Sequence, residues 1–429
     1  MRENFNSPQY KKYRRAYVTQ CTVEHLVGLL VLDAFLATLL NYLDLSDAMV
    51  GIITSFATVA FVFQLFSVAL VKSRFSTKKT VIFFDVISQS LFAFIYFLPF
   101  FPIAHDAKKG IVVVAVMVAQ ASKAVTLNLY FKWANRYVED SERAEFSAKK
   151  ECVSLICGIV FTAVMGYITD RFKDIGEIEG GLLFIALTMT VLNIINFISL
   201  IRIKDEPNRE RESMRVSARE VMGHIISNKL FFYYLLIGML GSVGSGLIGG
   251  FIGIYKIREL GLSLFVVQVI NITADFVRMG VSMPFARYSK KYGFARGLFL
   301  SSIILYIGYF SVIFTAPGTK WLIIIYSVCL SVSSAGSYQN SFNIAYTLLP
   351  QKYMVQAMAI LRTLTGVVSF LAALVGGKFL SIIQLNGNTV FGFNLYGQQF
   401  LAILGLSILI PALALKYKYV IKPLDRLIK

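Results

Sequence analysis

Charged residues are scarce in this sequence. Asp, Glu, Lys and Arg make up 15% of its 429 residues, whereas an average soluble domain contains about 25%. Hydrophobic residues make up 56%. Soluble cores cannot bury so large an apolar fraction, so the composition excludes an ordinary soluble protein and predicts a chain that lipid largely covers.

Cysteine and histidine are rare as well. The chain has four Cys and three His residues. Cys21, Cys152, Cys157 and Cys329 lie in or at the edge of apolar segments, and no pair has metal-ligand spacing with a histidine nearby. The sequence therefore predicts neither a disulfide framework nor a metal site, and these cysteines are interpreted as packing residues.

Motifs typical of energy-converting or catalytic domains are missing from the sequence. No Gly-rich loop ends in Lys and Ser or Thr, so ATP is not expected to be the direct energy source. No carboxylate-rich loop or His/Asp cluster is present of the kind that a membrane-embedded enzyme needs. We therefore expect no enzymatic activity and no cofactor.

Long apolar segments are what the sequence has instead. A hydrocarbon core of about 30 Å needs roughly 20 apolar residues per helix, and this length divides the chain into about twelve spans. We expect them near residues 22–42, 48–71, 80–100, 111–131, 151–169, 181–201, 230–255, 263–286, 297–316, 321–349, 355–383 and 395–415. The opening MRENFNSPQYKKYRRAY is polar for too long to begin a signal peptide, so the first span is expected to be retained.

The basic residues predict the orientation of these spans. Most of the 42 Lys and Arg residues fall on segments that face the cytoplasm if the N-terminus does, as the positive-inside rule requires. An even number of spans then places both termini in the cytoplasm. The net charge of +18 therefore indicates topology and contact with anionic membrane lipids, and nucleic acid is not an expected partner.

A polar interval from Ile201 to Lys229 divides the spans into two halves. We expect an N-terminal six-helix bundle at 1–201, a cytoplasmic linker at 202–229 and a C-terminal six-helix bundle at 230–429. The sequence LDLS before the second span, Leu43–Ser46, recurs as LGLS before the eighth span, Leu260–Ser263. Such weak recurrence indicates a duplicated six-helix unit.

The segment after the second span reads ALVKSRFSTKK and runs over residues 69–79. It resembles the signature of the major facilitator superfamily of secondary transporters, with Arg74, Lys78 and Lys79 at its basic positions. Ser73 and Ser76 stand where the family has Asp and Gly, which puts the family's cytoplasmic latch in doubt. The loop WANRYVEDSERAEFSAKKE is similar to the loop between helices four and five in a bacterial group of this superfamily without an assigned substrate.

This resemblance implies an all-α polytopic membrane protein with the major facilitator fold, located in a bacterial inner membrane. It also implies alternating access between two bundles. Helices one, four, seven and ten would line a central cavity. Helices two, five, eight and eleven would form the interface that moves.

Asp33 and Lys123 are charged residues inside otherwise apolar spans. A charge at a helix centre costs about 2.5 to 3.5 kcal/mol on insertion scales, so each is a candidate functional residue. Their depths agree to within roughly 5 Å at 1.5 Å per residue, which a lysine side chain can bridge. We predict a pair that substrate or a proton opens during transport; a permanent ion pair that locks the bundle is the alternative.

Other polar side chains of the spans are candidates to line the same site. Amide and hydroxyl groups suit a hydroxylated or zwitterionic solute, although polar contacts between helices explain them equally. These candidates are Gln120, Asn128, Tyr338, Gln339 and Asn343. Glu24 and His25 stand at the cytoplasmic start of span one, where a proton shuttle is possible in principle but an ordinary interfacial role is favoured.

Two groups of residues are candidates for a conformational latch. Arg74, Lys78 and Lys79 belong to the basic loop that carries the resemblance. Asp275 and Arg278 are three residues apart on span eight, and Arg362 begins span eleven. The spacing of Asp275 and Arg278 places both on one helix face, so they are expected to pair.

Together these features predict a secondary transporter of a small solute, driven by protons through Asp33 near Lys123, with membrane lipids as neighbours and a monomer as the functional form. A membrane-embedded lipid-modifying enzyme and a non-transporting receptor are the alternatives. The solute, and whether it is imported or exported, stay open at this point.

Overall fold

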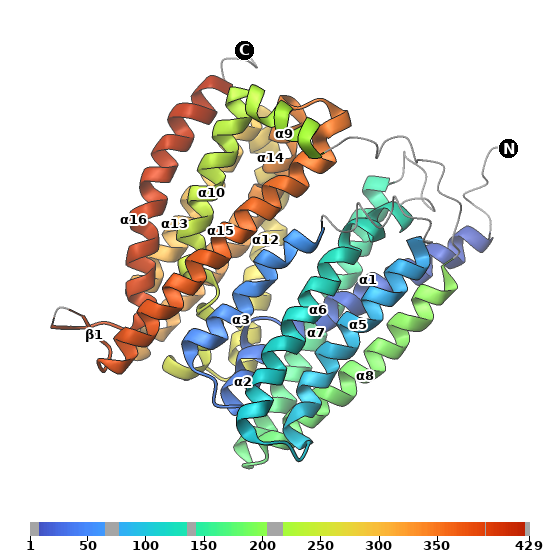
Figure 1. Cartoon of the computed structure of the whole chain (residues 1–429), viewed down its shortest axis with the longest axis vertical. Helices are drawn as coiled ribbons and strands as arrows, with labels where there is room; N and C mark the ends of the chain where they lie inside the picture. The colour runs from blue at the N-terminus through green and yellow to red at the C-terminus, as the bar shows by residue number, and fades with distance from the viewer. Residues whose placement is uncertain (1–7, 65–76, 135–142, 204–217, 391, 425–429) are drawn as a thin grey trace. The chain divides into compact units, whose positions relative to one another are not determined.

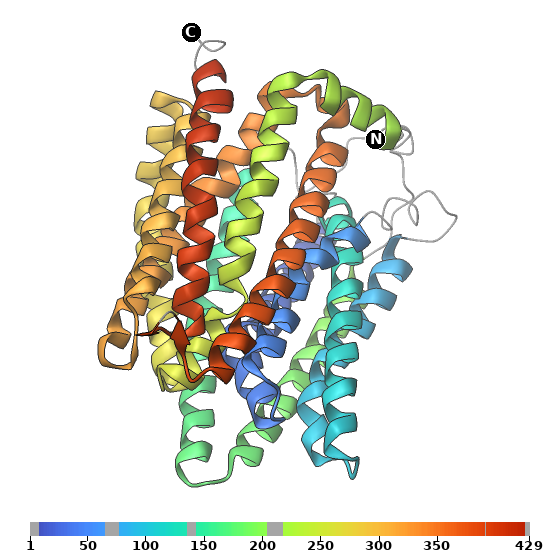
Figure 2. The same ribbon diagram turned by 60° about the vertical axis from the view of Figure 1, so that its left-hand side comes forward.

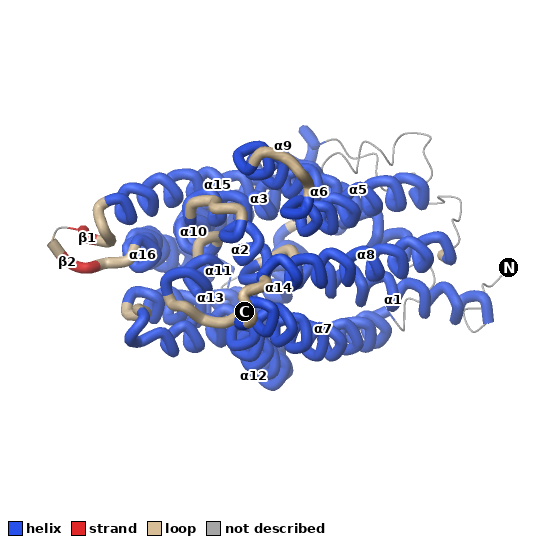
Figure 3. Tube along the Cα trace, turned by 90° about the horizontal axis from the view of Figure 1, so that it is seen from below, coloured by secondary structure: helices blue, strands red, loops and turns tan. Residues whose placement is uncertain are grey.

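The computed structural model of the protein describes residues 8–64, 77–134, 143–203, 218–390 and 392–424. Helices make up nearly all of these residues, as Figure 3 shows. The strands among them are two short ones, β1 (Thr389–Val390) and β2 (Phe393–Asn394), which pair antiparallel. The predicted all-α class is therefore confirmed.

The helices of the first half begin with α1 (Pro8–Leu30) and α2 (Asp33–Tyr42). The others are α3 (Asp47–Val59), η1 (Ala60–Phe63), α5 (Thr77–Phe97), η2 (Leu98–Phe100), α6 (His105–Ala134), α7 (Arg143–Asp174) and α8 (Ile178–Arg202). Each overlaps one of the six predicted apolar segments.

The helices of the second half begin with α9 (Ala218–Ser227), which lies inside the predicted linker. The others are α10 (Lys229–Gly249), α11 (Ile252–Ile254), η4 (Tyr255–Glu259), α12 (Leu264–Tyr292), α13 (Phe294–Ile313), η5 (Pro317–Leu322), α14 (Ile323–Leu348), α15 (Gln351–Leu385), α16 (Gly397–Lys416) and η6 (Tyr417–Ile421).

The helices account for the predicted spans. In the described part of the chain, ten helices are long and apolar enough to cross a membrane, and α1 and α2 pass the same test together as a pair bent by 46°. The apolar helix Asp47–Phe63 is shorter, and the rest of the second predicted span lies outside the described residues. Lipid imposes this helical form, because backbone groups in hydrocarbon must bond within their own segment.

The first span breaks between Leu30 and Asp33. Asp33 has a φ of 50°, in the left-handed region that Asp tolerates better than most residues. The break frees backbone carbonyls at the end of α1, and the hydroxyl of the buried Tyr96 donates to the Leu30 carbonyl at 2.5 Å. The acidic residue of this apolar span therefore marks the start of a new helix.

The described residues form two compact units. The first takes in Met1–Leu45, Ala60–Arg211 and Ser263–Gln268, as far as these ranges are described, and the second takes in Ser46–Val59, Glu212–Leu262 and Val269–Lys429. The contacts thus divide the chain differently from the predicted boundaries at 201 and 230. The helix α3 belongs to the second unit, and the first residues of α12 belong to the first unit.

In the first unit, α1 packs against α7 and α8, and α5 packs against α6 and α8 (Figure 1). Polar contacts join the apolar surfaces of α5 and α8. The amide of Asn196 donates to the Asp85 carboxylate at 2.5 Å, and Asn193 donates to the Gln89 carbonyl at 2.8 Å. Such contacts hold helices together where no hydrophobic effect operates.

In the second unit, α10 packs against α15 and α16, as Figure 2 shows. Glycines allow the close approach. A Cβ on Gly246 would lie 2.3 Å from the Ser369 carbonyl oxygen of α15, and one on Gly250 would lie 2.0 Å from the Ser55 hydroxyl of α3. Gly246 and Gly250, four residues apart, therefore serve helix packing, and the helix also breaks there, between Gly249 and Ile252.

The repeated motif LDLS and LGLS forms the same structure twice. The Ser46 hydroxyl accepts from the Met49 amide at 3.3 Å at the start of α3. The Ser263 hydroxyl accepts from the Val266 amide at 3.3 Å at the start of α12. Each serine is a helix N-cap, so the recurrence in sequence corresponds to two equivalent helix starts.

Candidate functional site

A cavity of about 380 Å³ lies within the first unit, among α1, α6 and α7. Its lining residues are Tyr17, Cys21, Glu24, His25, Gly28, Leu29, Leu32, Lys123, Leu127 and Lys150. We refer to it as the α1/α6 cavity. Two lysines, a glutamate and a histidine line it together with apolar side chains, and this composition is typical of a binding site.

One face of α1 forms a wall of the cavity. Tyr17, Cys21, Glu24 and Gly28 recur every three or four residues, so their side chains project from the same side of the helix. A Cβ on Gly28, on the same face, would be in van der Waals contact with the Lys123 ammonium nitrogen, at 3.6 Å. The Lys123 side chain of α6 therefore reaches the backbone of α1.

The Glu24 carboxylate is held in place by its own helix. The amide of Gln20, which is fully buried, donates to Glu24 Oε2 at 3.0 Å. The same Gln20 accepts from the Cys21 thiol at 3.4 Å. A buried amide thus orients the carboxylate on the cavity wall.

His25 reaches the cavity because α7 has a glycine opposite it. A Cβ on Gly158 would lie 2.9 Å from His25 Nε2 and 3.1 Å from the Leu29 side chain. Real Cβ atoms do not approach so closely without a shift. The position of the imidazole therefore depends on the absence of a side chain at 158.

The two lysines of the cavity differ in their surroundings. Lys150 of α7 lies 5.5 Å from the centre of the Tyr17 ring, and Tyr17 in turn stacks on Phe146, an arrangement that stabilises a cation. Within the described part of the chain, the half-buried Lys123 ammonium makes no hydrogen bond or ion pair. Lys123 is thus a cation in a cavity with room for an anionic ligand.

The predicted partner of Lys123 lies elsewhere. Asp33 is half-buried at the start of α2 and does not line the α1/α6 cavity. The pairing of Asp33 with Lys123 is not present in this arrangement and stays a prediction. The break at Leu30 is not visible in the hydropathy of the span, and it changes the direction in which residues beyond it project.

The other predicted site residues are described in part. Gln120 is buried on α6, and Asn343 is half-buried on α14. Neither lines the α1/α6 cavity. The side chains of Asn128, Tyr338 and Gln339 lie outside the described part of the structure, so their roles stay predictions.

The predicted latch residues occupy separate places. Arg74 lies outside the described residues. Lys78 donates to the Ile201 carbonyl at 2.7 Å, at the end of α8, and Lys79 follows it on α5. A cation at a helix C-terminus is favourable, so this contact fastens α5 to α8 inside the first unit.

On α12, Arg278 and Asp275 form an ion pair at 3.4 Å, as their spacing predicts. The Ser331 hydroxyl of α14 also donates to Asp275, at 3.3 Å. Arg362 lies on α15. Whether these residues act as a conformational latch stays a prediction.

Sequence reasoning missed a charged cluster at helix ends of the second unit, which the predicted topology places on the outer side. Its members, here called the outer cluster, are Asp47, Arg258, Glu259 and Gln384. The Asp47 side chain is fully buried and lies 2.6 Å from Arg258 Nη1. Gln384 donates to Asp47 at 2.7 Å and to Glu259 at 3.2 Å. Asp47, an acidic residue directly after LDLS at the edge of an apolar segment, could have indicated this cluster in the sequence.

A second contact at a helix start was missed in the same way. Asp170, at the end of α7, accepts from the amides of Leu264 and Phe265 at 3.0 and 2.7 Å. These are the first amides of α12, which have no partner within their own helix. A carboxylate at this position is favourable for both hydrogen bonding and the helix dipole.

Metal chemistry finds no support in the described residues. Among them, no three His, Cys, Asp or Glu side chains come together as a metal ion would need. The α1/α6 cavity offers ammonium groups, one carboxylate and one imidazole, and this set suits the binding of an organic ion.

Comparison with known proteins places the chain in a family. The family model of the Major Facilitator Superfamily matches residues 26–373. Similar solved structures include the nucleoside transporter NupG (13% identity, 96% of this chain and 99% of that one, TM-score 0.68). The D-xylose-proton symporter has 12% identity, 96% and 98% coverage and a TM-score of 0.71. The POT family transporter PepTSo has 9% identity, 96% and 97% coverage and a TM-score of 0.67.

These identities establish the fold alone. No curated protein sequence matches the chain. The family model, however, covers most of the sequence, including the residues of the α1/α6 cavity from Gly28 to Lys150. The protein therefore belongs to the Major Facilitator Superfamily of membrane transporters.

Proposed function

We propose that the protein is a secondary active transporter that binds a small organic anion or zwitterion in the α1/α6 cavity and moves it by alternating access. The observation that carries this proposal is the Lys123 ammonium, which makes no hydrogen bond or ion pair within the described part of the chain. An ionised group in a span is costly unless it has a partner or water. A carboxylate or phosphate on the solute supplies that partner.

The other groups of the cavity fit such a solute. Lys150 provides a second cation, while Glu24 can accept a hydrogen bond from an ammonium or hydroxyl group of the solute. Leu29, Leu32 and Leu127 offer apolar surface to its carbon skeleton. A pocket with few polar groups on an apolar wall is the usual form of a small-molecule site.

We further propose that protons drive transport through carboxylates of the first span. Asp33 at the helix break and Glu24 in the cavity are the two candidates. A carboxylate near a cation is held ionised, and arrival of an anionic solute at the cation favours its protonation. Asp33→Asn and Glu24→Gln, each assayed for pH-dependent uptake, distinguish the candidates. The proton site is the residue whose neutral variant loses the response to a pH gradient.

The experiment begins with a ligand-stabilisation screen of the purified protein against carboxylates, phosphates, amino acids, nucleosides and sugars. Counterflow of the labelled hit in proteoliposomes then tests for a carrier, since neither a receptor nor a lipid-modifying enzyme gives counterflow. Lys123→Gln is expected to weaken binding by about 100-fold and to abolish counterflow. Lys109→Gln is the matched control on the same helix, because Lys109 forms an i,i+3 pair with the exposed Asp106, at the end of α6 away from the cavity.

The proposal fails if the best hit carries no anionic group and binds Lys123→Gln as tightly as the original protein. A hit that binds without counterflow would instead favour the receptor alternative. The melting temperature of each variant is measured on the same preparation. A variant that has lost its fold is thereby distinguished from one that has lost only binding.

A further inference from the structure

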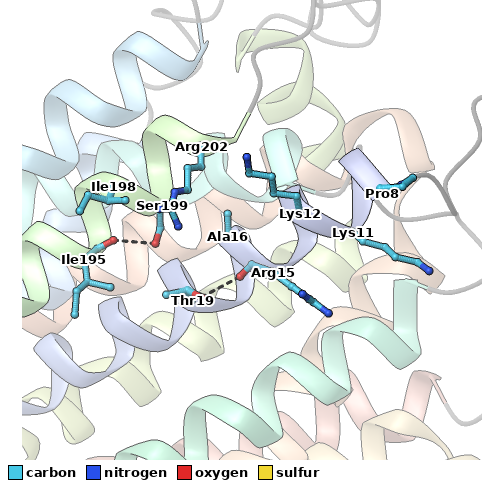
Figure 4. A pocket seen from close by; sticks show the side chains of 10 residues that line it. All are labelled: Pro8, Lys11, Lys12, Arg15, Ala16, Thr19, Ile195, Ile198, Ser199 and Arg202. Carbon is cyan, nitrogen blue, oxygen red and sulfur yellow. Dashed lines mark hydrogen bonds between the residues drawn. The ribbon is translucent and has the colours of Figure 1, made fainter.

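A second hollow of the first unit lies at the other end of α1. It has a volume of about 730 Å³ and is formed by the first turns of α1 and the last turns of α8 (Figure 4). Its lining residues are Pro8, Lys11, Lys12, Arg15, Ala16, Thr19, Ile195, Ile198, Ser199 and Arg202. We call it the basic hollow.

The basic hollow gathers positive charge. Lys11, Lys12, Arg15 and Arg202 line it, and no acidic residue does. None of these four forms an ion pair with any residue that the structure describes. An adjoining hollow of about 600 Å³ shares Lys11 and Arg15 with it and adds further basic side chains, Arg14 and Lys149. Like charges at short range repel, and an anion between them removes the repulsion.

Two cations from different helices converge in the hollow. Figure 4 shows the ends of Lys12 on α1 and Arg202 on α8 lying toward the same space, whereas Lys11 and Arg15 point away from it. The Ser199 hydroxyl donates to the Ile195 carbonyl at 2.8 Å, so the ligand contacts fall to the two cations. A guanidinium and an ammonium together form a suitable site for a phosphate group.

An apolar surface continues from the same hollow along α8. Ile195 and Ile198 line the hollow and are 39% and 42% exposed, and the neighbouring Ile194 and Ile201 are 55% and 50% exposed. In a membrane span, exposed isoleucine side chains contact acyl chains. The ligand that matches both parts is therefore amphiphilic, with an anionic head and hydrocarbon chains.

We propose that the basic hollow binds one anionic phospholipid, with its phosphate between Lys12 and Arg202 and an acyl chain along Ile195 and Ile198. Basic pockets between helices at the cytoplasmic surface suit the headgroups of such lipids, and the predicted orientation places this end of α1 there. A free phosphate would use the cations but leave the apolar surface without a role.

The test measures the melting temperature of the full-length protein in neutral detergent during lipid titration. The titrants are short-chain phosphatidylglycerol, phosphatidylcholine with the same chains, glycerol phosphate and inorganic phosphate. Phosphatidylglycerol is expected to raise the melting temperature most, and the two chain-free phosphates to have little effect. The doubly substituted Lys12→Gln, Arg202→Gln protein is expected to need at least about tenfold more phosphatidylglycerol for the same rise in melting temperature.

The matched control is Lys290→Gln with Lys291→Gln, which removes the same charge from exposed residues at the end of α12. It should respond to phosphatidylglycerol as the original protein does. If the doubly substituted protein does not fold, Lys12→Gln alone and the charge-preserving Arg202→Lys serve instead. Lys12→Gln is expected to lose less of the phosphatidylglycerol response than the double variant. Arg202→Lys is expected to lose little of it.

Two outcomes would overturn the proposal. The first is an unchanged phosphatidylglycerol response in the variants that remove charge from the hollow, or an equal loss in the Lys290 and Lys291 control. The second is stabilisation by inorganic phosphate or glycerol phosphate equal to that by the lipid, which would assign the hollow to a soluble anion.

Discussion

The α1/α6 cavity and the outer cluster both contain charged side chains, but the charges have different partners in the two places. In the outer cluster, the two oxygens of the buried Asp47 carboxylate are engaged separately, one by Arg258 and the other by Gln384. In the cavity, the Lys123 ammonium makes no hydrogen bond or ion pair within the described part of the chain.

The difference indicates two uses of the same chemistry. A carboxylate whose hydrogen bonds are satisfied by its own protein holds helix ends together, and removing one partner is costly. A cation beside an open volume carries a desolvation cost that a ligand can offset. Substitutions in the cavity should therefore affect binding, whereas substitutions in the outer cluster should affect stability.

The largest effect is expected for Lys123→Gln. Loss of a charged partner in a desolvated site typically costs 2 to 5 kcal/mol, so affinity for the solute found by screening should fall by about 100-fold. The melting temperature should stay the same or rise, because an unpaired charge is removed. Isothermal titration and thermal unfolding measure the two quantities. A large fall in melting temperature would show that Lys123, like Asp47, stabilises the fold and does not serve ligand binding.

Asp47→Ala comes next, with its effect on stability. It leaves Arg258 and Gln384 without their shared acceptor and should lower the free energy of unfolding by about 2 kcal/mol, since Arg258 is partly exposed. The reduced unfolding midpoint in detergent checks this value. Gln384→Ala, which keeps the ion pair, should cost only about 1 kcal/mol. Equal losses for the two variants would show that the ion pair itself contributes nothing.

Gly158→Ala tests whether His25 belongs to the cavity. Its new Cβ would lie 2.9 Å from His25 Nε2, so the imidazole must move, and solute affinity is expected to fall about fivefold. Overpacking of this kind also costs about 1 kcal/mol of stability. Gly110→Ala on α6 is the control, since no atom lies within 4 Å of its Cβ position. Unchanged affinity in Gly158→Ala would remove His25 from the binding site.

Asp170→Ala is expected to have the smallest effect. The substitution leaves the Leu264 and Phe265 amides at the start of α12 without their acceptor and should cost about 1 kcal/mol, as for other lost helix caps. Solute affinity should not change. Chemical unfolding compared with Ser263→Ala, which removes the serine cap of the same helix, shows whether the two caps are independent. A binding defect in Asp170→Ala would contradict the separation drawn above between charges for binding and charges for stability.

Some features of the structure are predictable from the sequence and others are not. The spans and the two serine caps at Ser46 and Ser263 were accessible from it, because helix formation and capping depend on neighbours within one turn. Lys123 was identified as well, since a lysine inside an apolar segment is conspicuous. The sequence favours an interfacial role for His25, whereas its place in the cavity depends on Gly158, far away in the chain.

The sequence by itself determined the all-α membrane class and predicted the apolar spans and their orientation, because hydrophobic length and basic loops act within short segments. The tertiary structure decided which polar groups meet. It brought Glu24, His25, Lys123 and Lys150 to one cavity, joined Asp47 to Arg258 and Gln384, and broke the first span before Asp33. These contacts join helices that are far apart in the sequence. Because hydropathy depends on one segment alone, it does not predict which other segment packs against it.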